Sequence, residues 1–187
     1  MRRWYGGTIE SDGTLTDTGA YFTGSYASYF GSAVFNDDDG TVSGSTFQKN
    51  STGFANAGGA IDNEGDMQLA CSTFTGNTGE YGGAVYNDAD MTMTRDSRTG
   101  NTAYNGDGID NDYDGDLTVY GSLIDFNRAS DEGGGIFNWE CGSFTVTHPA
   151  SYGNVPSNIS ANSAASGSTT AERQRTRFTP AGRPGID

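Results

Sequence analysis

The sequence predicts an all-β fold, namely a right-handed, single-stranded parallel β-helix of about six coils. Three observations predict it: a glycine-rich motif that recurs every 24 to 27 residues, a second motif in phase with the first, and a shortage of apolar residues. With 33% hydrophobic residues, 29 glycines and a net charge of −14, a chain of 187 residues would ordinarily remain unfolded. Apolar residues at strictly repeated positions remove this conflict, because each can pack on its copy in the next coil.

The glycine-rich motif occurs six times. Its copies are Gly6–Ser11, Gly31–Asn36, Gly58–Asn63, Gly82–Asn87, Gly106–Asn111 and Gly133–Asn138. Each copy indicates a turn followed by a short strand, because glycine supplies positive φ at corners and the side chains of a strand alternate between its two faces. The inward residues would form one apolar stack, consisting of Ile9, Val34, Ile61, Val85, Ile109 and Ile136.

The second motif is an apolar residue followed eight positions later by asparagine. It occurs in five units, as Val42/Asn50, Leu69/Asn77, Met93/Asn101, Val119/Asn127 and Val146/Asn154. The corresponding inward stack would be Leu15, Val42, Leu69, Met93, Val119 and Val146. Phe47, Phe74 and Ile124 would contribute to a third stack, which fails at Arg98. Asparagine repeated at one turn can also stack as an amide ladder.

These motifs place the β-helix in residues 1–162 and leave 163–187 as a low-complexity, flexible tail. The tail is rich in Ser, Ala and Thr and then in Arg and Pro, which is typical of linkers. We expect no membrane-spanning segment, since no apolar stretch approaches the ~20 residues that a spanning helix requires. The ends of a β-helix present unpaired strand edges, so end-to-end self-association is a candidate mode of assembly.

The strong negative charge restricts the partners of the chain. Acidic residues fill its body, whereas lysine occurs only at Lys49. Such a body repels phosphates, which argues against nucleic acid as a partner. It suits a protein that is secreted or displayed at the cell surface.

The two motifs resemble the repeats of polymorphic outer-membrane proteins, an autotransporter-like family. The resemblance covers roughly residues 6–154 and is strongest at Gly58–Asn77 and Gly82–Asn87. It implies a β-helical passenger that is displayed on the cell surface and linked to adhesion. A surface glycan or a protein would then be the partner.

Carboxylates cluster after each glycine-rich motif. The candidate cation ligands are Asp37, Asp39, Glu64, Asp66, Asp88, Asp90, Asp112, Asp114 and Asp116. Like charges stacked ~4.8 Å apart repel one another, so bound cations, high salt or splayed side chains should offset the repulsion. Oxygen ligands favour calcium over transition metals. The alternative is a set of solvated acidic turns, and no cofactor is strictly required.

In three coils, an aromatic residue comes one position after the inward residue of the first stack in the sequence. We expect these three residues to point outward and to bind a ligand: Phe35, Tyr86 and Phe137. An exposed aromatic strip can stack on sugar rings or on a partner surface. The alternative is passive packing under a neighbouring part of the protein.

These patterns favour a non-enzymatic structural or adhesion module, with two alternatives. The first is a carbohydrate-active lyase or hydrolase, which would need Arg95 or Arg128 in a groove near Asp96 or Asp125. The second is an ice-binding protein, because outward threonines recur around the second stack. They are Thr14, Thr16, Thr41, Thr92, Thr94, Thr118, Thr145 and Thr147, interrupted at Gln68, Ala70 and Tyr120. The alternative interpretation is that threonine is common at outward positions because of its high β-strand propensity.

Overall fold

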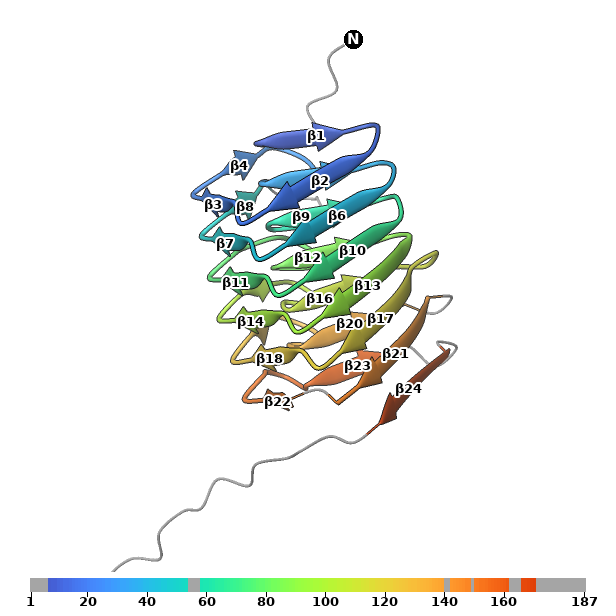
Figure 1. Ribbon diagram of the computed structural model, residues 1–187. Coiled ribbons are helices and arrows are strands. Elements are labelled where there is room, and N and C mark those ends of the chain that lie inside the picture. Colours follow the sequence, from blue (N-terminus) through green and yellow to red (C-terminus); the bar gives the residue numbers. More distant parts are fainter. Residues whose placement is uncertain (1–6, 54–57, 140–141, 149, 162–165, 171–187) are drawn as a thin grey trace, which may run out of the picture.

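The structure is a computed structural model that describes residues 7–53, 58–139, 142–148, 150–161 and 166–170. In this part of the chain the backbone forms 24 short strands and winds into a β-solenoid of about six turns (Figure 1). Each strand pairs in parallel with its counterpart one repeat further along the sequence. The predicted all-β fold with parallel stacking is therefore confirmed.

Three long sheets run along the solenoid, and we name them A, B and C. Sheet A contains β1 (Ile9–Ser11), β5 (Val34–Asn36), β9 (Ile61–Asn63), β12 (Val85–Asn87), β16 (Ile109–Asn111), β20 (Ile136–Asn138) and β23 (Ile159–Ala161). Sheet B contains β2 (Leu15–Thr18), β6 (Gly40–Ser43), β10 (Met67–Ala70), β13 (Asp90–Thr94), β17 (Asp116–Tyr120), β21 (Ser143–Thr147) and β24 (Ser166–Thr170).

Sheet C contains β3 (Tyr21–Thr23), β7 (Thr46–Gln48), β11 (Thr73–Thr75), β14 (Ser97–Thr99), β18 (Leu123–Asp125) and β22 (Ala150–Tyr152). After sheet C the chain forms two short strand pairs before it returns to sheet A. They are β4 (Tyr26–Ala27) with β8 (Ser51–Thr52), and β15 (Thr102–Ala103) with β19 (Arg128–Ala129). We call this return segment the loop side of the solenoid.

The first predicted stack is confirmed along the whole of sheet A. Ile9, Val34, Ile61, Val85, Ile109 and Ile136 are mutual register partners, and Ile159 continues the series. The members away from the two ends are fully buried. One apolar residue per strand is thus enough to build a continuous core.

The second predicted stack is confirmed from Val42 to Val146 and is wrong in the first coil. Val42 pairs with Asp17, whereas Leu15 pairs with Gly40. The corner glycines decide this register, because Gly19 and Gly44 both take a positive φ and the Gly19 amide hydrogen-bonds the Ser43 carbonyl. The apolar match of Leu15 to Val42 in the sequence is therefore two residues out of step.

Leu15 instead begins a further inward stack in sheet B. Its members in the later coils are Met67, Met91, Leu117 and Phe144, and all of them are buried. From β10 to β21, sheet B therefore contributes two inward apolar residues per strand, which doubles its own share of the core.

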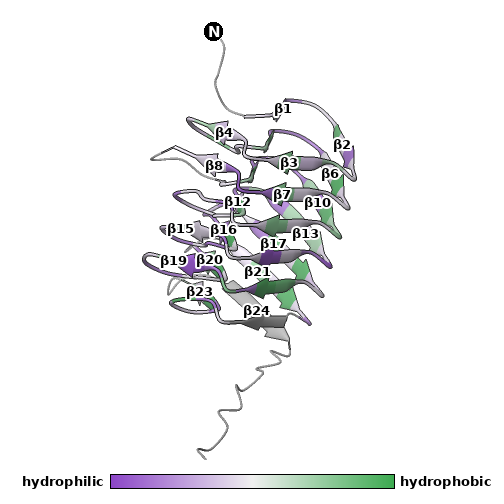
Figure 2. Ribbon diagram, turned by 90° about the vertical axis from the view of Figure 1, so that its left-hand side faces the viewer, coloured by the Kyte–Doolittle hydropathy of each residue, from purple (hydrophilic) through white to green (hydrophobic). Residues whose placement is uncertain are grey.

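Sheet C contains a stack of aromatic rings that is interrupted by an arginine. The Phe22 and Phe47 rings lie 4.8 Å apart, and the Phe47 and Phe74 rings 4.6 Å apart at an angle of only 2°. The next inward position is Arg98, followed by Ile124. Figure 2 shows this interruption as a hydrophilic strand, β14, between the more apolar β11 and β18. The predicted failure of the stack at Arg98 is confirmed, although the arginine side chain stays inside.

Two asparagine ladders run through the solenoid, as the repeated asparagines predict. In the first, each side-chain amide donates to the next carboxamide oxygen at 2.7–2.9 Å, through Asn36, Asn63, Asn87, Asn111 and Asn138. In the second, the distances are 2.9–3.0 Å, through Asn50, Asn77, Asn101, Asn127 and Asn154. These buried amides satisfy one another and thereby bind each coil to the next.

The described part of the solenoid reaches past residue 162, where the sequence predicts it to end. Strand β24 pairs with β21 over five residues. The tail arginines lie outside the described residues, and the described residues contain no helix long and apolar enough to cross a membrane.

Candidate functional site

The nine carboxylates predicted to bind cations lie in the turns between sheets A and B, where they sort into two columns. The first column directly follows the strands of sheet A and contains Asp37, Glu64, Asp88 and Asp112. The second precedes or begins the strands of sheet B and contains Asp39, Asp66, Asp90 and Asp116. Asp114 lies between the columns in the longer turn from β16 to β17.

The first asparagine ladder lies directly beneath this turn and holds its backbone. The Asn87 amide donates to the Ala89 carbonyl at 2.6 Å, and the Asn111 amide to the Gly115 carbonyl at 3.0 Å. The ladder thus holds both a short turn and a longer one at the same place in successive coils, which is why most of the carboxylates fall into columns.

The columns do not assemble a chelating site in the described residues. Within them, no group of three or more carboxylate, histidine or cysteine side chains lies close enough together to hold a metal ion. The carboxylates instead repel one another: burial, followed by the charges of Asp112 and Asp114, raises the pKa of Asp88. Asp39, Asp66 and Asp90 line a shallow trough of about 500 Å³, which is open and strongly acidic.

The three aromatic residues point outward from sheet A as predicted, but they do not form an exposed strip. Phe35 is only 4% exposed and Phe137 only 2%, and Tyr86 is half-buried. One ring covers each of the two phenylalanines, because Phe30 packs against Phe35 at 5.7 Å and Trp139 packs edge-on against Phe137 at 5.0 Å. The alternation along each strand correctly placed these residues on the outer face of sheet A, but that face is covered.

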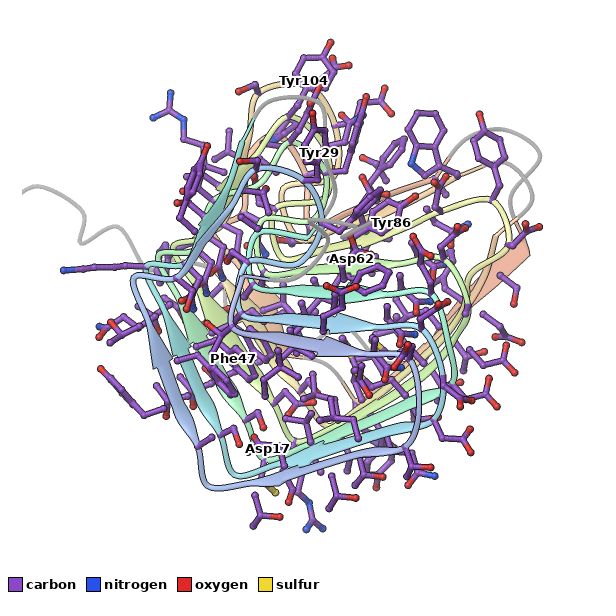
Figure 3. The ribbon with its side chains drawn as sticks, turned by 90° about the horizontal axis from the view of Figure 1, so that it is seen from above. Asp17, Tyr29, Phe47, Asp62, Tyr86 and Tyr104 are labelled. Atoms are coloured by element: carbon purple, nitrogen blue, oxygen red, sulfur yellow. The ribbon has the colours of Figure 1, made fainter. Side chains whose placement is uncertain are left out.

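Two aspartates alternate with these aromatic residues on the covered face of sheet A. Asp62 lies between Phe35 and Tyr86, and Asp110 lies between Tyr86 and Phe137. Figure 3 shows Asp62 and Tyr86 on the opposite side of sheet A from Phe47. Burial raises the pKa of both aspartates well above the usual range, and neighbouring carboxylates raise it further.

The polar groups of this column are partly satisfied by neighbouring turns. The Trp139 indole N–H donates to Asp110 at 2.9 Å, and the Tyr86 hydroxyl donates to Asp112. Burial and then the hydrogen bond to Asp112 raise the pKa of the Tyr86 hydroxyl. The column therefore links the covered face of sheet A to the acidic turn.

The threonines form two outward columns on sheet B. The first is Thr16, Thr41, Gln68, Thr92, Thr118 and Thr145. The second is Thr18, Ser43, Ala70, Thr94, Tyr120 and Thr147. The predicted interruptions at Gln68, Ala70 and Tyr120 are in place, and Thr14 precedes β2 instead of lying in a column. The first column is the more regular, with threonine on five of the seven described strands, because Gln68 and Ser168 occupy the other two positions.

The two arginines considered for catalysis, Arg95 and Arg128, have no exposed partner in Asp96 or Asp125. Both aspartates are buried, and Asp96 faces Arg98 inside the solenoid. Arg95 lies at a corner with a φ of 57°. None of the four residues proposed for a carbohydrate-active enzyme lines the acidic trough or a second hollow, on the loop side.

This second hollow is a groove that the sequence did not reveal. It has a volume of about 570 Å³ and is mostly apolar. Its lining residues are Tyr26, Thr52, Gly53, Thr78, Gly79, Glu80, Thr102, Ala103, Tyr104 and Ser130. Tyr26 and Tyr104 occupy different positions of the repeat, so aligning the repeats does not bring them together. The only sequence signal was the excess of tyrosine, which does not locate a site.

In comparisons with known proteins, no family model, no curated protein and no solved structure matches this chain. The resemblance to polymorphic outer-membrane protein repeats therefore rests on the sequence motifs alone.

Proposed function

We propose that this chain is a non-enzymatic structural and adhesion module that is secreted or displayed at the cell surface. The observation that supports it is the unbroken register of sheets A and B, in which equivalent residues stack through all the described coils. A solenoid of this kind places its faces in regular columns along a rigid rod, which suits extended contact surfaces. The motif resemblance to surface-displayed passengers agrees with this proposal.

Cations are the proposed stabilisers of the rod. The two acidic columns place like charges one coil apart, and such charges repel most at low ionic strength. Calcium, with its preference for carboxylate oxygens, is the candidate ion. Because no three carboxylates converge in the described residues, we expect diffuse neutralisation of the columns by cations instead of a dedicated cage.

Adhesion can be tested with beads that carry the full chain. Beads coated with the folded chain should adhere to cells or to an extracellular polysaccharide matrix. Beads coated with the same chain after unfolding, which has the same net charge, should not adhere. Equal adhesion by both kinds of bead, or none by either, would reject the proposal.

The first threonine column favours ice binding as a second candidate function. Its threonines repeat along a parallel sheet, with Gln68 as the break between Thr41 and Thr92 and Ser168 as the partner of Thr145 on the last described strand. Thermal hysteresis measured on the purified chain tests this candidate. A Gln68→Thr variant should increase the hysteresis if the column is the active face, and an absence of hysteresis in both proteins would exclude it.

A further inference from the structure

The groove on the loop side has the size and lining of a ligand site. Its volume of about 570 Å³ falls within the ~300–1,000 Å³ of small-molecule sites, which are mostly apolar with a few placed polar groups. Two tyrosines supply large aromatic surfaces, since Tyr26 is 64% and Tyr104 49% exposed. Figure 3 shows Tyr104 projecting from the loop side, away from Phe47 and the core.

The two tyrosines lie three coils apart, with small residues between them. Tyr26 belongs to the first coil and Tyr104 follows β15 in the fourth, which separates them by roughly 14 Å along the axis. Gly53 lies so close to Tyr26 that a β-carbon there would stand 3.1 Å from the tyrosine hydroxyl. At Gly79 a β-carbon would meet backbone atoms at 2.8 Å. Glycine at these two positions therefore lets neighbouring backbone segments pack closely beside the groove.

Hydroxyl groups follow one another along the groove. The Thr78 and Thr102 hydroxyls form a hydrogen bond of 3.0 Å with each other, and the exposed Ser130 adds a further hydroxyl to the lining. Each hydroxyl can both donate and accept. Among the described residues, one carboxylate oxygen of Glu80 is buried and has no hydrogen-bond partner. Glu80 lies in the lining of the groove, and rotation of its side chain would turn this unpartnered carboxylate oxygen toward a ligand.

The charges around the groove select against anionic ligands. Glu80 lies in the lining, and Asp131 is close enough to Tyr104 that its charge and a hydrogen bond raise the pKa of the tyrosine hydroxyl. A cation, Arg128, is the register partner of the lining residue Thr102, and its charge lowers the pKa of the nearby Asp107. A whole-chain net charge of −14 adds a long-range repulsion of anions. An uncharged ligand rich in hydroxyls is therefore the best match to the lining.

We propose that this groove binds an uncharged oligosaccharide. Tyr26 and Tyr104 stack on the apolar faces of sugar rings, because tyrosine combines an apolar face with a polar edge. Thr78, Thr102 and Glu80 hydrogen-bond the sugar hydroxyls. The inference rests on the proposed adhesion function, for which it names the partner class and the binding surface.

The test begins with the full chain on an array of oligosaccharides that contains neutral and anionic members. At least one neutral oligosaccharide should bind, and it is then titrated calorimetrically against the wild-type chain and its variants. Tyr104→Ala and Tyr26→Ala should each raise the Kd by about tenfold or more, because each removes an aromatic ring on which a sugar stacks. Glu80→Gln should raise it less, since an amide oxygen still accepts a hydrogen bond.

Tyr120→Ala is the matched control, because Tyr120 is 47% exposed on sheet B and lies outside the groove. It should leave the Kd unchanged. Thermal melts by circular dichroism check that every variant folds. The proposal is overturned if no neutral oligosaccharide binds, if only anionic members bind, or if Tyr120→Ala weakens binding as much as Tyr104→Ala.

Two further readouts distinguish a glycan groove from a contact between copies of the chain, and glycan binding from adhesion. If Tyr104→Ala converts an oligomer into a monomer, as seen by mass photometry, the groove is an interface between copies and the glycan proposal fails. If wild-type beads adhere and Tyr104→Ala beads adhere equally well, adhesion stands and the groove is not its site. If the titration shows binding but the beads do not adhere, the groove stands and the adhesion function fails.

Discussion

The guanidinium of Arg98 lies 3.8 Å from the carboxylate of Asp96 in the interior of the solenoid, and both side chains are completely buried. Arg98 also lies over the Phe74 ring, with its guanidinium carbon 5.3 Å from the ring centroid. Burial lowers the pKa of Arg98, while Asp96 counteracts that effect. In the neighbouring coils the same two positions are Ser72 with Phe74 and Ser122 with Ile124, so this coil replaces a neutral pair by an ion pair.

This relationship predicts opposite effects of single and double substitutions. Asp96→Ser alone leaves Arg98 without its counter-charge and should lower the free energy of unfolding by about 3–5 kcal/mol. The double variant Asp96→Ser/Arg98→Ile restores the pattern of the next coil and should be neutral or stabilising, by up to about 4 kcal/mol. Urea unfolding followed by far-UV circular dichroism measures both. A double variant as unstable as Asp96→Ser would contradict the assignment of a compensated buried ion pair.

The second asparagine ladder predicts a large cost for a small truncation. Asn77→Ala removes the amide that donates to Asn101 and to the Phe47 carbonyl, and the oxygen that accepts from Asn50. Unsatisfied buried groups should then lower the free energy of unfolding by about 2–4 kcal/mol. Thr75→Ala, at an exposed position of the same coil, is the control and should change stability by less than about 0.5 kcal/mol. Comparable losses in both variants would reject the ladder as a stabilising element.

The buried aspartates predict that the fold is more stable in mild acid than at neutral pH. Burial raises the pKa of Asp62 and Asp110 well above the usual range, and that of Asp107 to about 8. In the unfolded chain these aspartates lose their protons near pH 4. Above that pH the folded protein therefore binds more protons than the unfolded chain does. The free energy of unfolding should therefore fall as the pH rises above about 4. The part of this fall that comes from Asp107 should be complete at a pH of about 8.

Melting temperatures measured across this pH range check the slope. Asp62→Asn should reduce the slope and raise the melting temperature at neutral pH by about 2–4 °C for each kcal/mol gained. Asp37→Asn, at an exposed position of the acidic turn, is the control for general charge repulsion. A melting temperature that rises between pH 4 and 8 would show that the aspartates are not buried as described.

The acidic columns predict stabilisation by cations. The melting temperature should rise from EDTA to calcium and to magnesium, and also with NaCl at matched ionic strength, because the columns lack a cage for one ion in the described residues. Removal of the ions should reverse the effect. A large rise caused by sub-millimolar calcium alone would instead indicate specific sites among the nine carboxylates.

The positive φ at the corner between sheets B and C predicts that glycine is more stable there than other residues. Arg95 occupies this corner with a φ of 57°, and Gly121 occupies it in the next coil with a φ of 61°. Arg95→Gly should raise the free energy of unfolding by up to about 1 kcal/mol, since left-handed geometry costs other residues roughly 1–2 kcal/mol. Gly121→Ala should lower it by a similar amount, although a β-carbon would fit sterically there. Chemical denaturation of the two variants should show the opposite signs.

The sequence by itself determined the repeat and what the repeat places in register. The stack of Ile61, Val85 and Ile109, the asparagine ladders and the columns of turn carboxylates all follow from a period of 24 to 27 residues. These features are predictable because each coil contacts chiefly its neighbours, so one-dimensional spacing is enough to align them. In the first coil, the apolar match of Leu15 to Val42 points to a different register from the one that the corner glycine Gly19 sets.

Only the tertiary structure decided which faces are covered and which are open. Alternation along a strand places Phe35 and Phe137 on the outer face of sheet A, but the rings of Phe30 and Trp139 then bury them. Likewise, Tyr26 and Tyr104 occupy different repeat positions and share one groove only because the coils stack. Both outcomes depend on how loops of irregular sequence pack across coils, and no periodic pattern encodes such packing.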